Sequence, residues 1–377
     1  MTTEATLEPD AEVARPPYLG KDDVDRLFSV EEFEPLAALR MHPSTYAYVR
    51  GWAGTGWTVE NNIRAFRRWV FRPRVLVDVS DLDVSTTVLG ERISFPVMFA
   101  PTSVHRLAHP EGELATARAA RHLETLQVLS TGASQTIEDI AAVGPARWFQ
   151  LYWYTDRNLT RSLIDRAAAA GYSAIVLTVD AAIFGWREGE KRTTLVKPDG
   201  AWAVNLPKDT SGIVQEQSIT WHSLEWLRAV SPLPIVLKGI ARGDDARLAA
   251  EHGVDGIIVS NHGGRQADGA IATLDALPGI IAAVAGVAAD HRHEIYIDGG
   301  VRRGTDVLKA LALGARAVLV GRPVQWGLAA GGEAGIVRMM ELISGEFRSA
   351  LGLIGCRSVE DVTRALVTRN LDPTAGR

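Results

Sequence analysis

Two runs near the C-terminus, Glu294-Ile295-Tyr296-Ile297-Asp298 and Ala317-Val318-Leu319-Val320-Gly321, are almost continuously apolar and end in polar or glycine residues. Longer Ala- and Leu-rich segments of helical period separate such runs, which is the pattern of βα units around a parallel sheet. Eight such units predict an α/β chain folded as a single closed (β/α)₈ barrel of the TIM type. The six earlier runs are residues 96–100, 127–130, 148–152, 174–178, 235–238 and 256–260.

The segments outside these units predict three further features. Residues 20–90 are expected to form a helical extension followed by a short β segment, at 75–79 and 84–89, that closes the base of the barrel. Between Arg187 and about residue 220 the chain lacks clear periodicity, and a loop of that length is usually functional, so we expect a lid at about 188–219, after the fourth strand. The predicted organisation is one domain over residues 21–372, preceded by an acidic, disordered tail at 1–20.

The composition excludes several classes of function. The 377 residues carry a net charge of −5 and show no basic stretch interleaved with aromatics, so a nucleic-acid partner is not expected. The longest apolar stretch, 280–289, is too short to cross a bilayer, so no membrane anchor is expected. The single cysteine, Cys356, fits a reducing, cytoplasmic location. His105 and His109 have the helical spacing of a metal pair, but no acidic third ligand follows at a suitable interval, so we expect no metal.

The seventh and eighth strands both end in a glycine and arginine motif. These motifs are Asp298-Gly299-Gly300-Val301-Arg302-Arg303-Gly304 and Gly321-Arg322-Pro323. Glycines let backbone N–H groups approach a phosphate, and arginines add charge-assisted hydrogen bonds. The pattern predicts a phosphate site at the usual corner of this fold. The alternative is a pair of tight turns with solvated arginines.

The sixth strand ends in Ser260-Asn261-His262-Gly263-Gly264-Arg265-Gln266. A histidine there can act as a general base, and an arginine three residues later can hold a carboxylate. A structural histidine is the alternative. Beyond the fourth strand, Asp180 could stabilise the imidazolium and Arg187 could be a second carboxylate ligand, although the two residues could equally form a surface salt bridge.

Two further side chains at strand ends could carry chemistry. Lys238 on the fifth strand could form a Schiff base with a carbonyl substrate or pyridoxal phosphate, place positive charge beside a flavin, or form a buried ion pair. Tyr152 and Gln150 on the third strand point the same way because side chains alternate along a strand. The Tyr152 phenol could therefore donate to a substrate oxygen.

Together these motifs resemble the FMN-dependent 2-hydroxy acid oxidase and dehydrogenase family, which includes glycolate oxidase, lactate oxidase, lactate monooxygenase and mandelate dehydrogenase. The likeness runs from about residue 21 to 371. Further matching stretches are Ala100-Pro101-Thr102, His109-Pro110-Glu111-Gly112-Glu113, Phe149-Gln150-Leu151-Tyr152, Leu177-Thr178-Val179-Asp180 and Leu237-Lys238-Gly239.

The resemblance implies the oxidation of an (S)-2-hydroxy acid to a 2-keto acid, with the flavin reoxidised by O₂ or another acceptor, and a homo-oligomer, a tetramer or octamer. It implies that His262 is the base, supported by Asp180, that Arg187, Arg265 and Tyr48 hold the substrate carboxylate, and that Tyr152 faces the substrate oxygen. The residues that it implies for FMN are Pro101, Thr102, Ser103, Ser130, Gln150, Thr178, Lys238, Ser260, Asp298, Gly299, Gly300, Arg302, Gly321 and Arg322.

Two departures bear on the substrate and on the fate of the flavin. Gly132 stands where glycolate oxidase has tryptophan, which predicts a substrate side chain larger than hydrogen. Residues 183–187 and 264–269 are most similar to lactate oxidase and lactate monooxygenase, but the lid is shorter than in the monooxygenase. Oxidase, dehydrogenase and oxidative decarboxylation activities therefore stay open, as do a Schiff-base lyase that uses Lys238 and a catalytically silent barrel.

Overall fold

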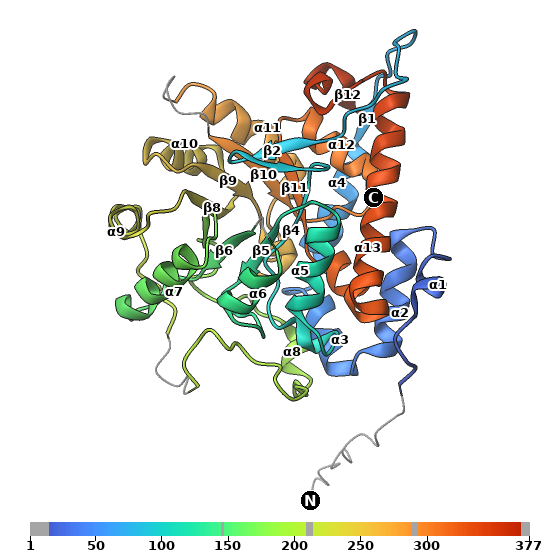
Figure 1. Cartoon of the computed structure of the whole chain (residues 1–377). Helices are drawn as coiled ribbons and strands as arrows, with labels where there is room; N and C mark the ends of the chain where they lie inside the picture. The colour runs from blue at the N-terminus through green and yellow to red at the C-terminus, as the bar shows by residue number, and fades with distance from the viewer. Residues whose placement is uncertain (1–14, 145–146, 209–213, 288–292, 371–377) are drawn as a thin grey trace, which may run out of the picture.

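The computed structural model describes residues 15–144, 147–208, 214–287 and 293–370. Eight parallel strands close into a barrel in the order β10-β11-β4-β5-β6-β7-β8-β9 (Figure 1). Every predicted run forms one of these strands, so the predicted (β/α)₈ barrel is confirmed. The strands are β4 (Val97–Phe99), β5 (Gln127–Ser130), β6 (Arg147–Leu151), β7 (Ile175–Thr178), β8 (Ile235–Ile240), β9 (Gly256–Val259), β10 (Glu294–Asp298) and β11 (Ala317–Val320).

Helices surround the barrel and cover the outward faces of its strands. The longest, α13 (Arg322–Leu353), contains a kink at Gly331 and Gly332, where the backbone leaves helical geometry. The others are α5 (Glu113–His122), α6 (Ile137–Val143), α7 (Arg157–Ala169), α9 (His222–Val230), α10 (Gly243–Glu251), α11 (Thr273–Val284) and α12 (Gly304–Ala312), with 3₁₀ turns at His105–Leu107, His262–Gly264, Val359–Asp361 and Arg364–Leu366.

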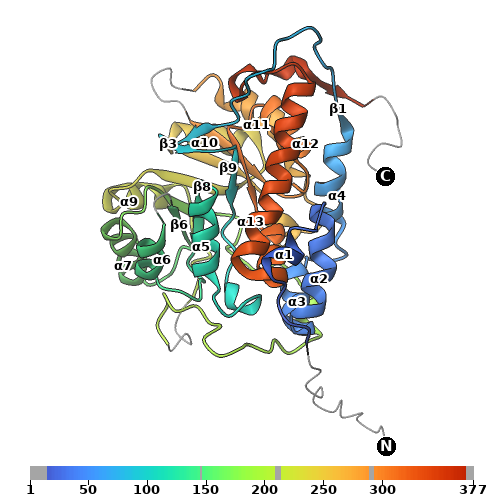
Figure 2. The ribbon, with the colours of Figure 1, turned by 45° about the vertical axis from the view of Figure 1, so that its right-hand side comes forward.

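The N-terminal extension is helical, as predicted, and packs on one side of the barrel. Figure 2 shows its first two helices beside α13. Its last element, β1 (Trp69–Phe71), pairs antiparallel with the C-terminal strand β12 (Val367–Arg369). The helices are α1 (Lys21–Val24), α2 (Phe33–Arg40), α3 (Pro43–Arg50) and α4 (Trp57–Ala65), with 3₁₀ turns at Val30–Glu32 and Phe66–Arg68.

The strands are apolar throughout because both of their faces are buried. Alternate side chains point into the barrel, where Met98, Trp148 and Tyr296 form one core cluster with their neighbours. The intervening side chains, such as Phe99 and Phe149, point outward into a larger cluster beneath the helices. Core packing therefore sets the strand geometry and fixes where each strand ends.

A hairpin closes the base of the barrel, but it differs from the predicted one. It consists of β2 (Thr86–Val88) and β3 (Glu91–Ile93), and Val88 and Ile93 join the interior cluster. The expectation of a strand at 75–79 was wrong, because Val75 and Leu76 are exposed and pair with no other strand. In Figure 1 this hairpin lies at the upper end of the barrel, opposite α8 (Glu188–Lys191) and α3.

The predicted tail and lid fall partly outside the described residues, at 1–14 and 209–213. Within the rest of the predicted tail, the Leu19 amide donates to the Ala330 carbonyl at 2.8 Å. Of the predicted lid, residues 188–208 and 214–219 are described, and α8 packs against α3. None of the helices in the described part of the chain is long and apolar enough to cross a membrane.

Candidate active site

A cavity of about 270 Å³ opens at the carboxyl ends of the barrel strands. It brings together five of the six residues predicted for catalysis and ten of the fourteen predicted for the cofactor. The lining residues among them are Tyr48, Pro101, Thr102, Ser103, Tyr152, Arg187, Lys238, His262, Arg265, Asp298, Gly299, Gly300, Arg302, Gly321 and Arg322. The remaining predicted residues lie behind this lining: Asp180, Ser130 and Ser260 hydrogen-bond directly to His262, Ser103 and Lys238. Gln150 bonds to Ser130, and Thr178 bonds to Gln150.

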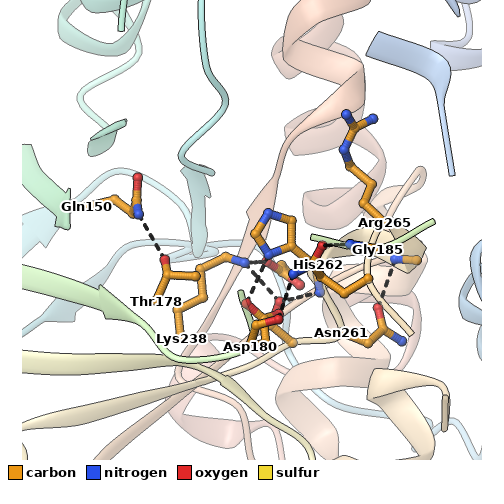
Figure 3. A network of polar contacts seen from close by, with 12 residues as sticks. Gln150, Thr178, Asp180, Gly185, Lys238, Asn261, His262 and Arg265 are labelled. Atoms are coloured by element: carbon orange, nitrogen blue, oxygen red, sulfur yellow. Dashed lines mark hydrogen bonds and ion pairs between the residues drawn. The ribbon is translucent and has the colours of Figure 1, made fainter. Parts of the chain in front are cut away.

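His262 and Asp180 form a hydrogen-bonded pair at this cavity (Figure 3). The His262 Nδ1 atom lies 2.9 Å from Asp180 Oδ1, which leaves Nε2 as the ring nitrogen that can act on a ligand. The histidine backbone has a φ of +58°, a left-handed conformation that is strained for a residue with a side chain. A hydrogen bond from the His262 amide to Ser260 Oγ, at 3.0 Å, helps to hold it.

The surroundings of this pair favour a neutral imidazole and a charged carboxylate. Burial lowers the pKa of His262, Asp180 opposes that effect, and Lys238 adds to it. Burial alone would raise the pKa of Asp180, but His262 and Lys238 outweigh it and hold the pKa below its ordinary value. A neutral imidazole next to a carboxylate can accept a proton and be stabilised once it is charged.

Lys238 is buried and donates to Ser260 Oγ at 3.0 Å, while its Nζ lies 3.3 Å from Asp298 Oδ2. Burial opposes its charge, but Asp298, Asp180 and Tyr152 raise the pKa of the amine above its ordinary value. A Schiff-base lysine needs an amine that loses its proton readily. The geometry therefore favours a fixed positive charge over a nucleophile.

A hydrogen-bonded chain of polar side chains runs behind the cavity lining on the β5–β7 side of the site. Ser103 Oγ and Ser130 Oγ lie 3.1 Å apart, and Ser130 donates to Gln150 Oε1 at 3.2 Å. The other end of the Gln150 amide donates to Thr178 Oγ1 at 3.0 Å, as Figure 3 shows. Gln150 and Thr178 lie on neighbouring strands, which fix the positions of their side chains. The remaining hydrogen-bond donors and acceptors of this chain therefore have fixed positions for a ligand.

The two predicted carboxylate arginines lie together between the loops that follow β7 and β9. Arg187 Nε donates to the Arg265 carbonyl at 3.0 Å, and Arg187 Nη2 donates to Gln266 Oε1 at 3.2 Å. Arg265 Nη1 donates to the carbonyls of Tyr48 and Gly51 at 2.7 and 3.0 Å. Asp180 and Arg187 therefore do not form a surface salt bridge with each other, which was the alternative at these positions.

Two tyrosines complete the rim of the cavity. Tyr48 comes from α3, and the Arg265 guanidinium lies 5.1 Å from the centre of its ring. Tyr152 lies one residue beyond the end of β6, where burial raises the pKa of its phenol to about 12. The Tyr152 hydroxyl therefore keeps its proton at neutral pH and can donate it to a ligand oxygen.

At the predicted phosphate corner, Arg302 and Arg322 are partly buried in the cavity wall and form no ion pair with any carboxylate among the described residues. Burial, together with Arg265 and Arg302, lowers the pKa of Arg322 to about 9. The Nε of Arg322 and Oδ1 of Asp298 are buried without a hydrogen-bond partner. The arginines are therefore not solvated turn residues, and a phosphate dianion would satisfy their charge.

The glycines of this corner allow close backbone approach. A Cβ on Gly300, whose φ is +87°, would lie 2.3 Å from the Asn62 carbonyl oxygen. Glycine is therefore required here, because the loop packs directly against the backbone of α4. Two partly buried arginines without a carboxylate partner and an unpaired polar atom on Asp298 fit the phosphate and polar edge of FMN.

The structure describes the surroundings of two positions considered in the sequence analysis. His105 is buried between Thr102 Oγ1 and Thr116 Oγ1, at 2.7 and 2.9 Å, so its two ring nitrogens already have partners. Gly132 does not line the cavity, and a Cβ on it would lie 2.7 Å from Ser103 Oγ. The Ser103 side chain therefore fills space that a larger residue at position 132 would need.

Sequence reasoning missed several residues at the site. Val49, Ala100, Phe184 and Gln325 also line the cavity. Gln266 was quoted within a motif but given no role, and its amide contacts Asp180, Ile183, Gly185 and Arg187. Its place next to Arg265 in the sequence was the one feature that could have marked Gln266 as a site residue. Phe184 offered no signal, because an exposed phenylalanine in a loop has no period to mark it.

Comparison with known proteins agrees with this geometry. The model of the family described as FMN-dependent dehydrogenase matches residues 37–369. An L-lactate oxidase of Nostoc sp. is 47% identical over 88% of this chain and 95% of its own length. A 2-hydroxyacid oxidase of Mus musculus is 44% identical, over 92% of this chain and 97% of its own.

Among solved structures, a mandelate oxidase with benzoyl-formic acid superposes with a TM-score of 0.85 at 41% identity. That match covers 92% of this chain and 99% of the other. The family predicted from the motifs is thereby confirmed over nearly the whole described chain. We conclude that this chain belongs to the FMN-dependent dehydrogenase family.

Proposed function

We propose that the chain binds FMN in the cavity at the carboxyl ends of the strands and oxidises an (S)-2-hydroxy acid there to the 2-keto acid. The observation that carries the proposal is the His262–Asp180 pair, which faces the same cavity as Arg187 and Arg265. A base, two cations for a carboxylate and two cations for a phosphate are thus placed around one space.

The side chains divide the reaction between them. Arg187 and Arg265 would hold the substrate carboxylate, and the Tyr152 phenol would donate to an oxygen at the reacting carbon. His262 Nε2 would accept a proton from the substrate, and Asp180 would stabilise the imidazolium at Nδ1. When bound, FMN supplies the acceptor for two electrons.

The cofactor would be held by two groups of residues. Arg302, Arg322, Gly299, Gly300 and Gly321 surround the space proposed for the phosphate. Lys238, held in its charged form by Asp298, would place a positive charge near the flavin ring. The Ser130–Gln150–Thr178 chain would hydrogen-bond to the polar edge of the ring.

The substrate is proposed to be a lactate-like acid with a side chain larger than hydrogen, and the electron acceptor to be O₂. Val49, Ala100 and Phe184 are apolar lining residues of the cavity, and the Phe184 ring centre lies 5.8 Å from the Arg187 guanidinium. Apolar lining suits an alkyl or aryl group better than a bare hydrogen. The L-lactate oxidase and mandelate oxidase relatives support this choice. Oxidative decarboxylation of the lactate monooxygenase type is the alternative.

We also propose that residues 188–219 act as a lid and that the protein is a cytoplasmic homotetramer. Ile183, Phe184, Trp186 and Trp202 are each more than half exposed. Such a group of large apolar side chains is typical of an interaction surface.

The only cysteine, Cys356, is buried and reduced, as expected in a reducing compartment.

The test is anaerobic bleaching of the FMN absorbance of purified protein by glycolate, lactate and mandelate, followed by readmission of air. Lactate and mandelate are expected to bleach faster than glycolate, and recolouring with stoichiometric peroxide would identify an oxidase. Carbon dioxide in place of peroxide would indicate oxidative decarboxylation. If the FMN-loaded protein is bleached by none of the acids, the proposed reaction is wrong.

A further inference from the structure

One carboxylate lies next to both arginines proposed for the substrate carboxylate. Glu190, on α8, places Oε1 2.7 Å from Arg265 Nη2 and 3.5 Å from Arg187 Nη1. The three side chains are mostly buried, with exposed fractions of 23%, 16% and 13%. Charge pairs at such positions are screened less by solvent than surface pairs. The contact is therefore not an ordinary surface salt bridge.

Glu190 holds the arginines from outside the cavity. Both arginines line the cavity, whereas Glu190 does not. Arg265 Nη1 donates to the carbonyls of Tyr48 and Gly51, and its Nη2 donates to Glu190. Both terminal nitrogens of that guanidinium are therefore held by partners. The two guanidinium groups repel each other, since Arg265 lowers the pKa of Arg187, and Glu190 opposes that effect.

We propose that Glu190 is the positioning residue of the carboxylate site: by bridging Arg187 and Arg265 it keeps two like charges side by side, and it ties their placement to helix α8. This inference rests on the proposed function, because it assumes that the arginines hold a substrate carboxylate. It assigns to the predicted lid segment a part in substrate binding, through Glu190, a residue to which sequence reasoning gave no role.

The position of Glu190 in α8 links substrate binding to the order of this helix. If Glu190 stabilises the arginine arrangement that binds a carboxylate, a bound carboxylate must stabilise the Glu190 contact to the same extent. Arg192 follows α8 directly, and its side chain is 77% exposed. Trypsin cleavage after Arg192 therefore reports on this helix without any measurement of activity.

The experiment compares E190Q and E190D with E188Q in the FMN-loaded protein. Glu188 lies on the same helix and, among the described residues, forms its ion pair with Arg192, at 3.1 Å, so E188Q removes the same charge without removing a contact to Arg187 or Arg265. E190Q is expected to raise the KM for the 2-hydroxy acid about tenfold, as loss of one charge-assisted hydrogen bond does, with kcat changed less than about threefold. E190D should recover most of this loss, and E188Q should behave like the parent.

Two further readouts separate positioning from general damage. The KM for the corresponding uncharged 2-hydroxy amide should be the same in E190Q and the parent. A 2-keto acid product, pyruvate or benzoyl-formate, should slow cleavage after Arg192 in the parent and in E188Q but not in E190Q. The inference is overturned if E190Q matches E188Q, or if E190Q weakens the amide as much as the acid. A parent protein that no 2-hydroxy acid reduces would instead refute the proposed function.

Discussion

The strained backbone at His262 and its contact with Asp180 give the imidazole one fixed orientation. Since Asp180 occupies Nδ1, only Nε2 can take a proton from a substrate. We predict that His262→Ala slows reduction of the flavin by about 10²–10⁴-fold, the usual contribution of a positioned base. Stopped-flow bleaching measures the rate. The FMN content per protein should stay at the parent value, because the residues proposed for the phosphate lie on other strand ends; a colourless variant would contradict the assignment.

The charges around His262 also set the pH range of the reaction. Burial and Lys238 lower the pKa of His262, and Asp180 raises it. The base is active when neutral, so the acid limb of kcat/KM in the parent should fall below pH 6.5, the ordinary value for histidine. Asp180→Asn removes the carboxylate that raises this pKa. The limb should then move to lower pH while the plateau falls, and a move to higher pH would contradict the electrostatics described here.

Single residues were predictable where a strand end marked them. His262, Asp180 and Lys238 each follow or end an apolar run, and the carboxyl ends of parallel strands meet at one face. Tyr48 has no such mark, and only the family resemblance placed it at the site. Glu190 lies three residues after Arg187, but its contact with Arg265 is tertiary and spacing along the chain does not encode it.

At the scale of elements, the loops after β7 and β9 are in close contact, and Gly185 makes this contact possible. A Cβ on Gly185 would lie 2.4 Å from the Arg265 carbonyl oxygen and 2.5 Å from that of Gln266. Gly185→Ala should push the loops apart and displace Arg187, so we predict a KM for the 2-hydroxy acid raised about tenfold or more.

The matched control for that change is Gly189→Ala, because a Cβ on Gly189 meets nothing within 4 Å. Steady-state kinetics of the two variants, with melting curves to confirm folding, test the prediction. Equal KM values in both variants would mean that the close approach of the loops does not set the arginine position.

The eight barrel strands were predictable because each is apolar on both faces and is separated from the next by a helical segment. Three short strands outside the barrel were not. β1, β3 and β12 have three residues each, too few to show a period. Their pairing is also decided by distant segments, since β1 pairs with β12 across nearly the whole chain. The exposed segment 75–79 has strand-forming residues without a partner, and so propensity alone misled.

For the molecule as a whole, chemistry and stability lie at opposite ends of the barrel. Ile93 at the base is fully buried and packs with the barrel interior, far from the cavity at the carboxyl ends. We predict that Ile93→Ala lowers the free energy of unfolding by about 2–5 kcal/mol, while kcat and KM measured well below the melting temperature stay at parent values.

Chemical denaturation of the two proteins measures this difference, and Leu76→Ala is the control because Leu76 is fully exposed on the same connection. Leu76→Ala should leave the free energy of unfolding within about 0.5 kcal/mol of the parent. A loss of activity in folded Ile93→Ala would mean that the base and the mouth of the barrel are coupled.

The pairing of β1 with β12 bears on how the protein is made. Val70 lies opposite Thr368, and a ribosome adding about 5–20 residues per second needs roughly 15–60 s for the 300 or so residues between them. During that time Phe33, Phe66 and Trp69 already exist, whereas part of the surface that covers them has not yet been synthesised. All three are buried in the finished molecule. The emerging chain thus exposes apolar side chains near its N-terminus until the last strand is made, and we expect chaperones that bind this segment to raise the yield in a cell.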